Sequence, residues 1–422
     1  AARFKAPVDL DLDAQGNIYV VDEGNQKLRQ IIASNSKVST LISNQPSNGL
    51  AVDPSGNLYY TWYHELRFLL LSCGGNGQCQ SGVCVKKLSG PDSKSYDHFG
   101  QSVDIQFDRA VVSKPQSNNK AGAVYVYDRS VSGAWSQTAK IMAKNPQAKD
   151  SFGQHVAVHG QRVAVSAIND NPKPLPTGAV YVFEYDGKSW TEIEKLAASD
   201  AASGDEMGSS LAFDGDYLVA GSHKKSNFAG AAYVFEKQPD GSYSQLNKLT
   251  PGKDTQNNAR FGHSTAIAGN KIAIGATHYT DQGKIQGAVF IFEKQPSGKF
   301  EIDTKLLAAD GKNKDQFGSS VAIDTGVIVV GAAFGDGKSQ DTGAAYIFEA
   351  AGGGPYQQVA KLFDSGNGLK GDRFGETVAI DGSQVVVAAP WHNGVKTDIG
   401  AVFLYERQIN GSYVLTKKFI PS

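Results

Sequence analysis

One pattern of apolar and polar positions recurs six times along the chain, and each copy predicts four short β-strands. In the copy at 317–363, "FGSSVAID" is small and apolar, "VIVVGAA" is β-branched, "GAAYIFE" is apolar and aromatic, and "YQQVAKLF" alternates. Continuous apolar runs are typical of strands buried on both faces, whereas alternation is typical of a strand with one face in solvent. Short turns follow the first and third strands, and long connections follow the second and fourth. Each copy therefore predicts an antiparallel four-stranded meander, with both long connections at one edge.

Three sequence marks keep the same order in all six copies. Phe-Gly, or Met-Gly in one copy, opens each unit, and successive glycines lie 53, 55, 54, 56 and 57 residues apart. Gly-Ala precedes the third strand, and an aromatic residue stands five positions before a Lys in the fourth. A sheet that is apolar on both faces must pack against others, and radial packing closes such sheets into a ring. We therefore predict an all-β fold, a single β-propeller of four-stranded antiparallel blades.

Residues 1–92 carry a different pattern, twice. Each copy has a strand, an Asp-x-x-Gly-Asn turn and two further strands, with room for a fourth in "KVSTLIS" and "VCVKKLS". These two units and the six in 93–422 predict one domain over 1–422 with eight blades. Seven blades is the alternative if one N-terminal unit is a cap.

Composition and charge narrow the classes of partner. The 422 residues include 47 Gly, 17 Tyr and 20 Phe, which suits many short strands and tight turns. The net charge is −1 and no dense Lys/Arg block occurs, so we exclude nucleic-acid binding. No run of 18 apolar residues occurs, so we exclude membrane insertion. The opening "AARFKAPVDL" leads us to expect a mature, soluble product whose leader has been removed.

The three cysteines lie together in "LLLSCGGNGQCQSGVCVKK". Cys73 and Cys84 flank a Gly-rich hairpin loop whose strands could bring them within bridging distance. We predict a Cys73–Cys84 disulfide with Cys79 left over, which favours a secreted or cell-surface location. The alternative is three reduced cysteines in a cytosolic protein.

The six later units resemble the FG-GAP repeats of integrin α-chain propellers and of many secreted proteins. "FGETVAIDGSQVVVAAPW" comes nearest to the full motif, through Phe374, Gly375, Ala389 and Pro390. The two opening units resemble NHL repeats, through Gly16-Asn17 and Gly56-Asn57. Both resemblances imply propeller blades, and the first implies a platform for binding or adhesion.

Integrin blades often hold calcium in an acidic loop between the first two strands, and this chain departs from that pattern. The corresponding turns have three or four residues, which is too short for six to eight oxygen ligands. We therefore expect no calcium of that kind, and no cofactor. A regular acid two residues before the Phe-Gly or Met-Gly pair is expected to accept backbone N–H groups of its turn. These acids are Asp97, Asp150, Asp205, Asp315 and Asp372.

Aromatic and imidazole side chains gather in the predicted connections between second and third strands. Rings beside hydrogen-bonding groups suit sugars or peptide side chains, although each ring could instead pack between blades. The predicted ligand-binding residues are Trp62, Tyr63, His64, His223, Phe228, His278, Tyr279, Phe334, Trp391 and His392.

Four of these histidines also allow an enzymatic interpretation. His64, His223, His278 and His392 could hold a zinc ion if their loops turned inward, and some proteins with NHL blades are lyases with a metal in the channel. They lack the short, fixed spacings of a local zinc motif, and no catalytic or phosphate-binding motif occurs. The other four histidines lie on or beside predicted first strands and are interpreted as structural: His98, His155, His159 and His263.

The sequence thus favours a non-enzymatic, lectin-like or adhesion module that binds a glycan or a protein through its long-loop edge. The first alternative is a propeller enzyme, a lyase or hydrolase with a histidine metal site. The second is a structural unit of a larger extracellular assembly that contacts its neighbours through blade edges or Cys79.

Overall fold

The computed structural model describes residues 97–419 apart from 131–134, 171–175, 351–353, 367 and 393–400, and in residues 1–96 it describes the backbone of the strands. The chain divides into two compact units, which are described separately below. One consists essentially of residues 8–197, and the other of residues 198–422 together with 3–7.

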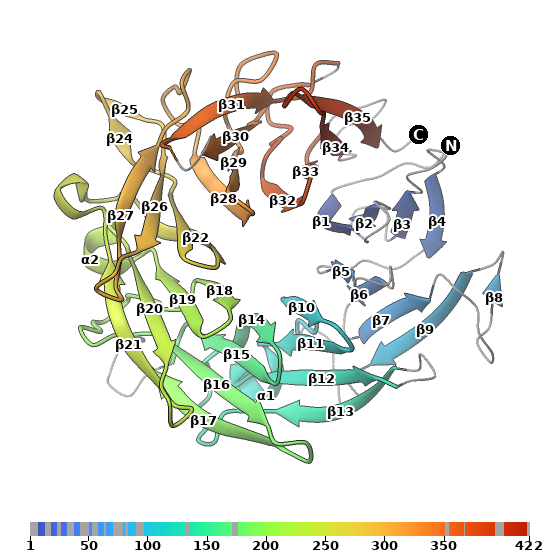
Figure 1. Ribbon diagram of the computed structural model, residues 1–422. Coiled ribbons are helices and arrows are strands. Elements are labelled where there is room, and N and C mark those ends of the chain that lie inside the picture. The colour runs from blue at the N-terminus through green and yellow to red at the C-terminus, as the bar shows by residue number, and fades with distance from the viewer. Residues whose placement is uncertain are drawn as a thin grey trace. The chain divides into compact units, whose positions relative to one another are not determined.

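In the unit of residues 8–197, the sheets follow one another along the chain (Figure 1). The first has the order β1-β2-β3-β4, with β1 (Pro7–Leu12), β2 (Ile18–Asp22), β3 (Lys27–Ile31) and β4 (Val38–Ile42). The second has the order β5-β6-β7-β9-β8, with β5 (Leu50–Val52), β6 (Leu58–Trp62), β7 (Glu65–Leu70), β8 (Cys79–Gln80) and β9 (Val83–Ser89). The third contains β10 (Val103–Gln106), β11 (Arg109–Lys114), β12 (Ala123–Arg129) and β13 (Trp135–Ile141). The fourth contains β14 (Phe152–His159), β15 (Arg162–Ala167), β16 (Ala179–Tyr185) and β17 (Trp190–Leu196).

The unit that contains residues 198–422 repeats the same arrangement. Its first sheet contains β18 (Ser210–Asp214), β19 (Tyr217–Ser222), β20 (Ala231–Lys237) and β21 (Tyr243–Leu249). The next contains β22 (Phe261–Ala268), β23 (Lys271–Ala276), β26 (Ala288–Lys294) and β27 (Phe300–Leu306), with the small pair β24 (Thr280–Asp281) and β25 (Lys284–Ile285) between its second and third strands in sequence. The third contains β28 (Phe317–Asp324), β29 (Val327–Ala332), β30 (Ala344–Ala350) and β31 (Tyr356–Leu362). The last contains β32 (Thr377–Asp381), β33 (Gln384–Ala389), β34 (Ala401–Arg407) and β35 (Tyr413–Phe419).

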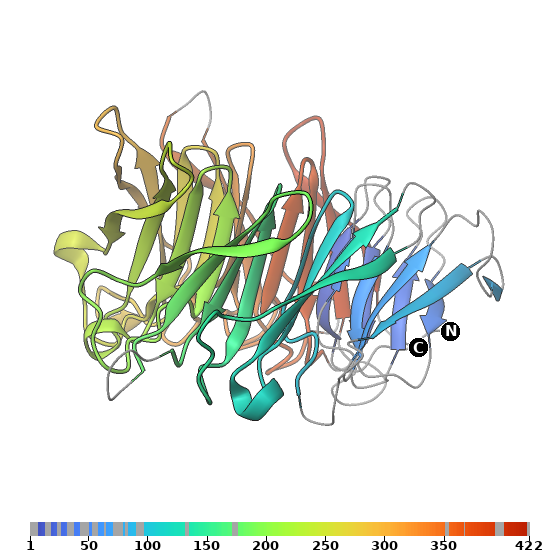
Figure 2. The ribbon, with the colours of Figure 1, turned by 90° about the horizontal axis from the view of Figure 1, so that it is seen from below.

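Helices are short in the described part of the chain. They are α1 (Ser117–Lys120), α2 (Lys225–Phe228) and the 3-10 turn Gly252–Asp254. Helix α1 lies between the second and third strands of its sheet, beyond the strand ends (Figure 2).

Burial follows the apolar pattern of each strand. In β29 every residue after Val327 is buried, and the first five residues of β30 are buried as well. In strand β31 only the end residues Tyr356 and Leu362 are buried, and the five residues between them are partly or largely exposed. The second and third strands are therefore packed on both faces, and the fourth presents one face to solvent.

Neighbouring sheets are joined by close backbone contacts at a recurring glycine. In four of the described sheets, the Gly before the third strand forms a parallel bridge with the Phe that opens the next sheet. A Cβ at Gly287, for example, would collide with the backbone of Phe317, so only glycine permits this approach. The bridges are Gly122–Phe152, Gly230–Phe261, Gly287–Phe317 and Gly343–Phe374.

The all-β prediction is confirmed, and the predicted strands occur in the predicted order. "KVSTLIS" and "VCVKKLS" form the fourth strands β4 and β9. Strands β8, β24 and β25 were not predicted, and β8 places Cys79 opposite Cys84 in the backbone register. Cys73 and all three cysteine side chains lie outside the described part, so the Cys73–Cys84 disulfide stays a prediction, as does a closed ring of eight blades.

Candidate functional site

We call each four-stranded sheet a blade. At four junctions in the described part of the chain, the connection between the second and third strands of one blade hydrogen-bonds to the connection that leads into the next blade. We call the connection between the second and third strands loop 2–3, and the residues directly before the Phe-Gly or Met-Gly pair the leading turn. The Ser151 N–H donates to the Lys120 carbonyl at 2.8 Å, and the Arg260 N–H donates to the Phe228 carbonyl at 2.7 Å. These bonds hold loop 2–3 of one blade against the leading turn of the next, so both lie at the long-loop edge.

The acid of the leading turn closes that turn in four of the blades. The Asp205 carboxylate accepts the Ala202 N–H at 2.6 Å, and the Asp315 carboxylate accepts the Lys312 N–H at 2.8 Å. Asp150 and Asp372 make the equivalent bond at 2.8 Å. The predicted turn-capping role is therefore confirmed at these positions.

The residue directly before the Phe or Met adopts the left-handed backbone conformation in all six blades. We call it the pre-Phe residue. Its φ lies between 51° and 56° although it is never glycine. The constant backbone therefore carries a variable side chain at each junction. The residues are His98, Ser151, Glu206, Arg260, Gln316 and Arg373.

Two positions of loop 2–3 complete each junction. The second residue after the second strand, which we call the rim residue, is partly exposed in every case. The third, the inner residue, is buried in every case. The rim residues are Gln116, Asn169, Lys224, His278, Phe334 and Trp391, and the inner residues are Ser117, Asp170, Lys225, Tyr279, Gly335 and His392.

Inner residues complete buried polar clusters. The Tyr346 hydroxyl of the third strand donates to Asp310 at 3.0 Å, and its blade has glycine at the inner position. Where the third strand carries Phe290 or Phe403 instead, the inner residue supplies the polar group. Tyr279 bonds to Lys305 at 3.0 Å, and His392 bonds to Asp364 at 2.8 Å.

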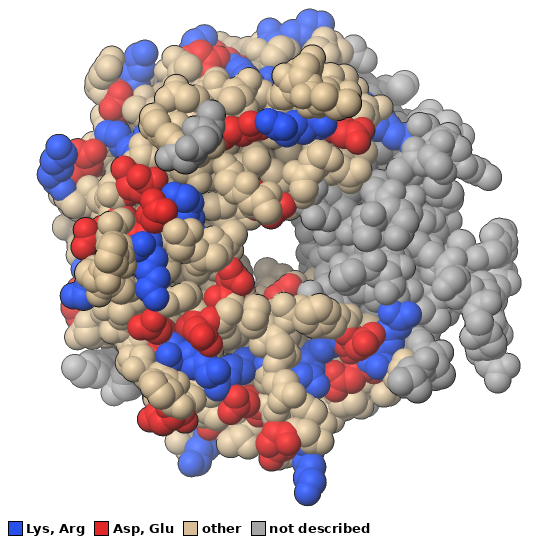
Figure 3. Space-filling model, viewed as in Figure 1, with Lys and Arg blue, Asp and Glu red and all other residues tan. Residues whose placement is uncertain are grey.

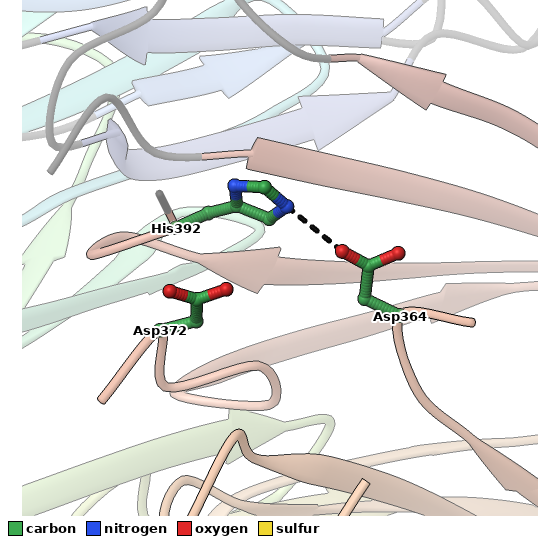
Figure 4. Close-up of side chains that lie close together, drawn as sticks. All are labelled: Asp364, Asp372 and His392. Atoms are coloured by element: carbon green, nitrogen blue, oxygen red, sulfur yellow. Dashed lines mark hydrogen bonds and ion pairs between the residues drawn. The ribbon is translucent and has the colours of Figure 1, made fainter. Parts of the chain in front are cut away.

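Asp364, Asp372 and His392 come together in the last blade (Figure 4). Their ligand atoms lie within 4.8 Å of one another, and within the described ranges no other three His, Cys, Asp or Glu residues do so. Figure 4 shows the second ring nitrogen of His392 on the side away from Asp364. Burial opposes ionisation of Asp364, but hydrogen bonds from His392 and Lys418 outweigh it and hold the pKa of this carboxyl below its usual range.

This cluster has the chemistry of an ion-pair network rather than of a metal centre. The Lys418 ammonium already contacts the Asp364 carboxylate and would repel a metal cation. In the β18–β21 blade, the equivalent carboxylates Asp200 and Asp205 face the ammonium of the inner residue Lys225, at 3.5 and 2.7 Å. In both blades a lysine ammonium thus lies against the buried carboxylates.

The structure separates the predicted ligand-binding residues into surface and buried groups. Tyr279 is 3% exposed and His392 is 0% exposed, so neither presents its ring at the surface. Phe228 and Trp391 are 39% and 43% exposed, and His278, Phe334 and His223 are half-buried. Trp62 lies at the end of β6 with only its backbone described, and Tyr63 and His64 lie outside the described residues.

The histidines of this edge have lowered pKa values. Burial, with smaller contributions from His263, Lys224 and Arg260, lowers the pKa of His223 to about 4. Burial and Arg260 likewise lower the pKa values of His263 and His278. The rings of His223 and His263 lie 5.9 Å apart. These side chains are therefore neutral at pH 7 and can both donate and accept hydrogen bonds.

A cavity of about 720 Å³ opens at the junction of the β10–β13 and β14–β17 blades. Rim residues Gln116 and Asn169 line it, together with the pre-Phe residue Ser151. The remaining lining residues are Asn119, Lys120, Gln147, Ala148, Lys149, Asp150, Gln154 and Pro176. Side-chain amides and lysines thus dominate a concave site at the long-loop edge.

The corresponding position between the β28–β31 and β32–β35 blades is filled by an arginine. The Arg373 guanidinium lies over the ring of Phe334 at 5.0 Å and over the ring of Trp391 at 5.6 Å. The two rings are rim residues of adjacent blades. Arg373 therefore contacts aromatic side chains from two blades. Its site lies at the long-loop edge, as the cavity does.

Sequence analysis missed the leading turns as a source of site residues. Arg373, Arg260 and Ser151 all directly precede a Phe-Gly pair, so alignment of the repeats on that pair could have found them. The amides Gln116 and Asn169 were also missed, because polar loop residues carry no distinctive signal. On the face shown in Figure 3, positive and negative side chains of the described residues are interspersed, so charge alone does not mark the site.

Six segments of this chain match a known repeat family. A model described as FG-GAP repeat matches residues 83–127, 135–183, 190–235, 243–292, 301–348 and 356–405. No curated protein matches this chain. The NHL resemblance of residues 1–92 stays a prediction. The described residues contain no helix whose length and apolar character would allow it to cross a membrane.

Three solved structures match this chain over most of its length at low sequence identity. Selenomethionine-substituted virginiamycin B lyase from Staphylococcus aureus is 11% identical, with a TM-score of 0.45 over 77% of this chain and 91% of that chain. A catalytically inactive form of the same lyase with quinupristin is 9% identical, with a TM-score of 0.47 over 78% of this chain and 92% of that chain. A chain of the mitotic checkpoint complex is 13% identical, with a TM-score of 0.47 over 92% of this chain and 88% of that chain.

The matched segments run from the fourth strand of one blade through the third strand of the next, and they include all six Phe-Gly or Met-Gly pairs. Together with the repeated antiparallel sheets, they confirm the predicted β-propeller fold. This chain belongs to the FG-GAP repeat family.

Proposed function

We propose that this protein is a non-enzymatic recognition module, secreted or exposed at the cell surface, that binds a glycan through its long-loop edge. The observation that carries the proposal is the cavity of about 720 Å³ between the β10–β13 and β14–β17 blades. Its volume is that of a small-ligand site. A protein ligand at the same edge is the second occupant to test.

The lining of the cavity favours sugars. Each side-chain amide offers two donors and an acceptor, a combination that matches sugar hydroxyl groups. Gln116, Gln154 and Asn169 provide such amides, and Lys120 and Lys149 add exposed cations. The buried Asp150 is occupied by the Gln147 N–H of its own turn. The polar surface is therefore suited to hydrogen bonding, and no group in it is arranged as a nucleophile with a base.

The constant backbone of the junctions supports recognition as well. The pre-Phe position keeps its left-handed backbone in all six blades while its side chain changes, and the rim position keeps its place after the second strand. Repeat scaffolds commonly bind ligands through variable residues on one edge. The secreted or cell-surface location rests on the clustered cysteines and on the family resemblance.

A glycan array probed with the full-length protein tests this proposal. We expect binding to a defined set of oligosaccharides, weakened about 30-fold by the double variant Gln116→Ala/Gln154→Ala, since each of the two lost hydrogen bonds is worth about 1 kcal/mol. Gln161→Ala is the matched control, because Gln161 is exposed in the short turn between β14 and β15 at the opposite edge. Undiminished binding by the double variant would contradict the proposed site, and the absence of glycan binding would contradict the function.

A further inference from the structure

The cavity and the arginine site are the same structural position in different blades. In the cavity, the pre-Phe residue Ser151 and the rim residues Gln116 and Asn169 line the same space. At the junction of the β28–β31 and β32–β35 blades, the pre-Phe residue is Arg373 and the rim residues are Phe334 and Trp391. The same position is therefore a polar cavity between the β10–β13 and β14–β17 blades. Between the β28–β31 and β32–β35 blades it holds a cation and two aromatic rings.

The guanidinium of Arg373 contacts neighbouring side chains, but these contacts leave N–H groups available for a ligand. Contact with two aromatic rings restricts its position, and its side chain is 36% exposed. Its one ion pair within the described ranges is with Glu376, at 3.6 Å, which is beyond hydrogen-bonding distance. The N–H groups at the edge of the guanidinium thus remain open to a ligand.

The neighbouring charges do not cancel this cation. Asp341, whose backbone carbonyl bonds to the leading turn at Gly371, is paired with Lys370 at 2.7 Å. Burial raises the pKa of Glu376, with Arg373 opposing the shift. Because Glu376 lies 3.6 Å from the guanidinium and makes no hydrogen bond to it, the exposed N–H groups of Arg373 can still attract an anion.

The chemistry of the three side chains selects one class of ligand. A stacked guanidinium presents paired N–H groups that match a carboxylate or sulfate in a planar, bidentate arrangement. Trp391, 43% exposed, adds a flat apolar surface next to that anion site. An acidic sugar offers both an anionic group and an apolar ring face, whereas the short side chain of an acidic peptide offers the anion alone.

We propose that Phe334, Arg373 and Trp391 form a subsite for the carboxylate or sulfate group of an acidic sugar. This subsite rests on the proposed glycan-binding function and adds its preference for charge. The binding step involves no covalent change.

Titration calorimetry of the full chain tests the subsite with four probes: a galacturonic acid hexamer, a sulfated sugar hexamer, a neutral glucose hexamer and an Asp/Glu hexapeptide. We expect an acidic hexamer to bind at least about 10-fold more tightly than the neutral one, because charge-assisted hydrogen bonds are roughly twice as strong as neutral ones. Comparison of the first two probes distinguishes carboxylate from sulfate. Preference for the hexapeptide over both acidic sugars would overturn the proposal.

Variants separate this subsite from the cavity. Arg373→Gln should remove the preference for the acidic hexamer, and Arg373→Lys should restore it only in part, because lysine keeps the charge but loses the bidentate geometry. Trp391→Ala should weaken binding of the acidic hexamer without reversing the preference. Lys299→Gln, which removes an exposed cation from the turn between β26 and β27, should leave binding unchanged.

The outcomes also distinguish this inference from the proposed function. If Arg373→Gln binds the acidic hexamer as wild type does while Gln116→Ala/Gln154→Ala does not, the subsite is wrong and the glycan-binding function stands. If wild type binds none of the sugars, both fail. Thermal unfolding of each variant checks that lost binding is not lost folding.

Discussion

At the residue scale, the aspartate of the leading turn has different surroundings in two blades. Asp205 faces the Lys225 ammonium at 2.7 Å, with both side chains 6% exposed. The inner residue opposite Asp315 is Gly335, which supplies no charge. Burial, followed by the neighbouring Asp336 and Asp310, raises the pKa of Asp315 to about 6. The Asp205 carboxylate is therefore stabilised by Lys225. The Asp315 carboxylate is buried without such a partner, which lowers the stability of the fold when it is ionised.

This contrast predicts opposite effects of one substitution. Asp205→Asn leaves Lys225 without its closest anion and should destabilise the protein by about 3 kcal/mol, as expected when one partner of a buried pair is removed. Asp315→Asn keeps the hydrogen bond from the Lys312 N–H but removes an unfavourable charge. Near pH 8 it should stabilise the protein by on the order of 2 kcal/mol. Thermal unfolding of the two variants measures both changes.

The pH dependence of Asp315 follows from the sign of its shift. The folded state holds the proton more tightly than the unfolded chain, so the contribution of Asp315 to stability is most favourable below its ordinary pKa. It declines as the pH rises from about 4 through about 6, and the penalty is complete above that range. The advantage of Asp315→Asn should therefore disappear near pH 4. An advantage of equal size at both pH values would contradict this explanation.

At the element scale, the glycine before each third strand controls the contact between blades. Its φ is +90° at Gly287, and the backbone of Phe317 occupies the space where a Cβ would lie. Gly298, in the turn between β26 and β27, has a φ of +84° but open space around it. The two glycines share a conformational requirement and differ in packing.

We expect Gly287→Ala to destabilise the protein by on the order of 3 kcal/mol, through both a left-handed alanine and a steric collision. Gly298→Ala should cost only about 1 kcal/mol, because the conformational penalty acts alone. Denaturant unfolding followed by tryptophan fluorescence compares them. Equal costs would show that the parallel bridge does not restrict the chain as described.

At the scale of the whole molecule, the balance of charge decides how copies of the protein interact. The chain has 41 Lys and Arg residues against 42 Asp and Glu residues, for a net charge of −1. The described charges are interspersed on the face in Figure 3. Repulsion between copies is therefore weak near neutral pH.

We expect reversible self-association to be strongest near neutral pH and to decrease at pH values where the net charge is large, since like-charged copies repel. Light scattering at low salt across a pH series measures this. A scattering intensity that does not change with pH would indicate that shape-specific contacts, rather than charge, govern association.

Much of the fold followed from the pattern of the sequence, and less of the candidate site did. The apolar run of β29 was readable because that strand is packed on both faces, and the polar residues of β31 were readable because that strand is partly exposed to solvent. Tyr279 and His392 were predicted to face a ligand, yet they occupy buried inner positions. The sequence could not reveal this, because the exposed rim residue and the buried inner residue are consecutive positions in loop 2–3.

The amino-acid sequence by itself determined the family, the strand order and the edge at which the long loops meet, because these depend on periodic burial and on turn glycines that recur in every repeat. Only the tertiary structure decided which side chains share a junction. Arg373 lies in a leading turn, and its aromatic partners lie in the loops of two different blades. That meeting depends on how one sheet packs against the next, a relationship between segments far apart in the chain that no local pattern specifies.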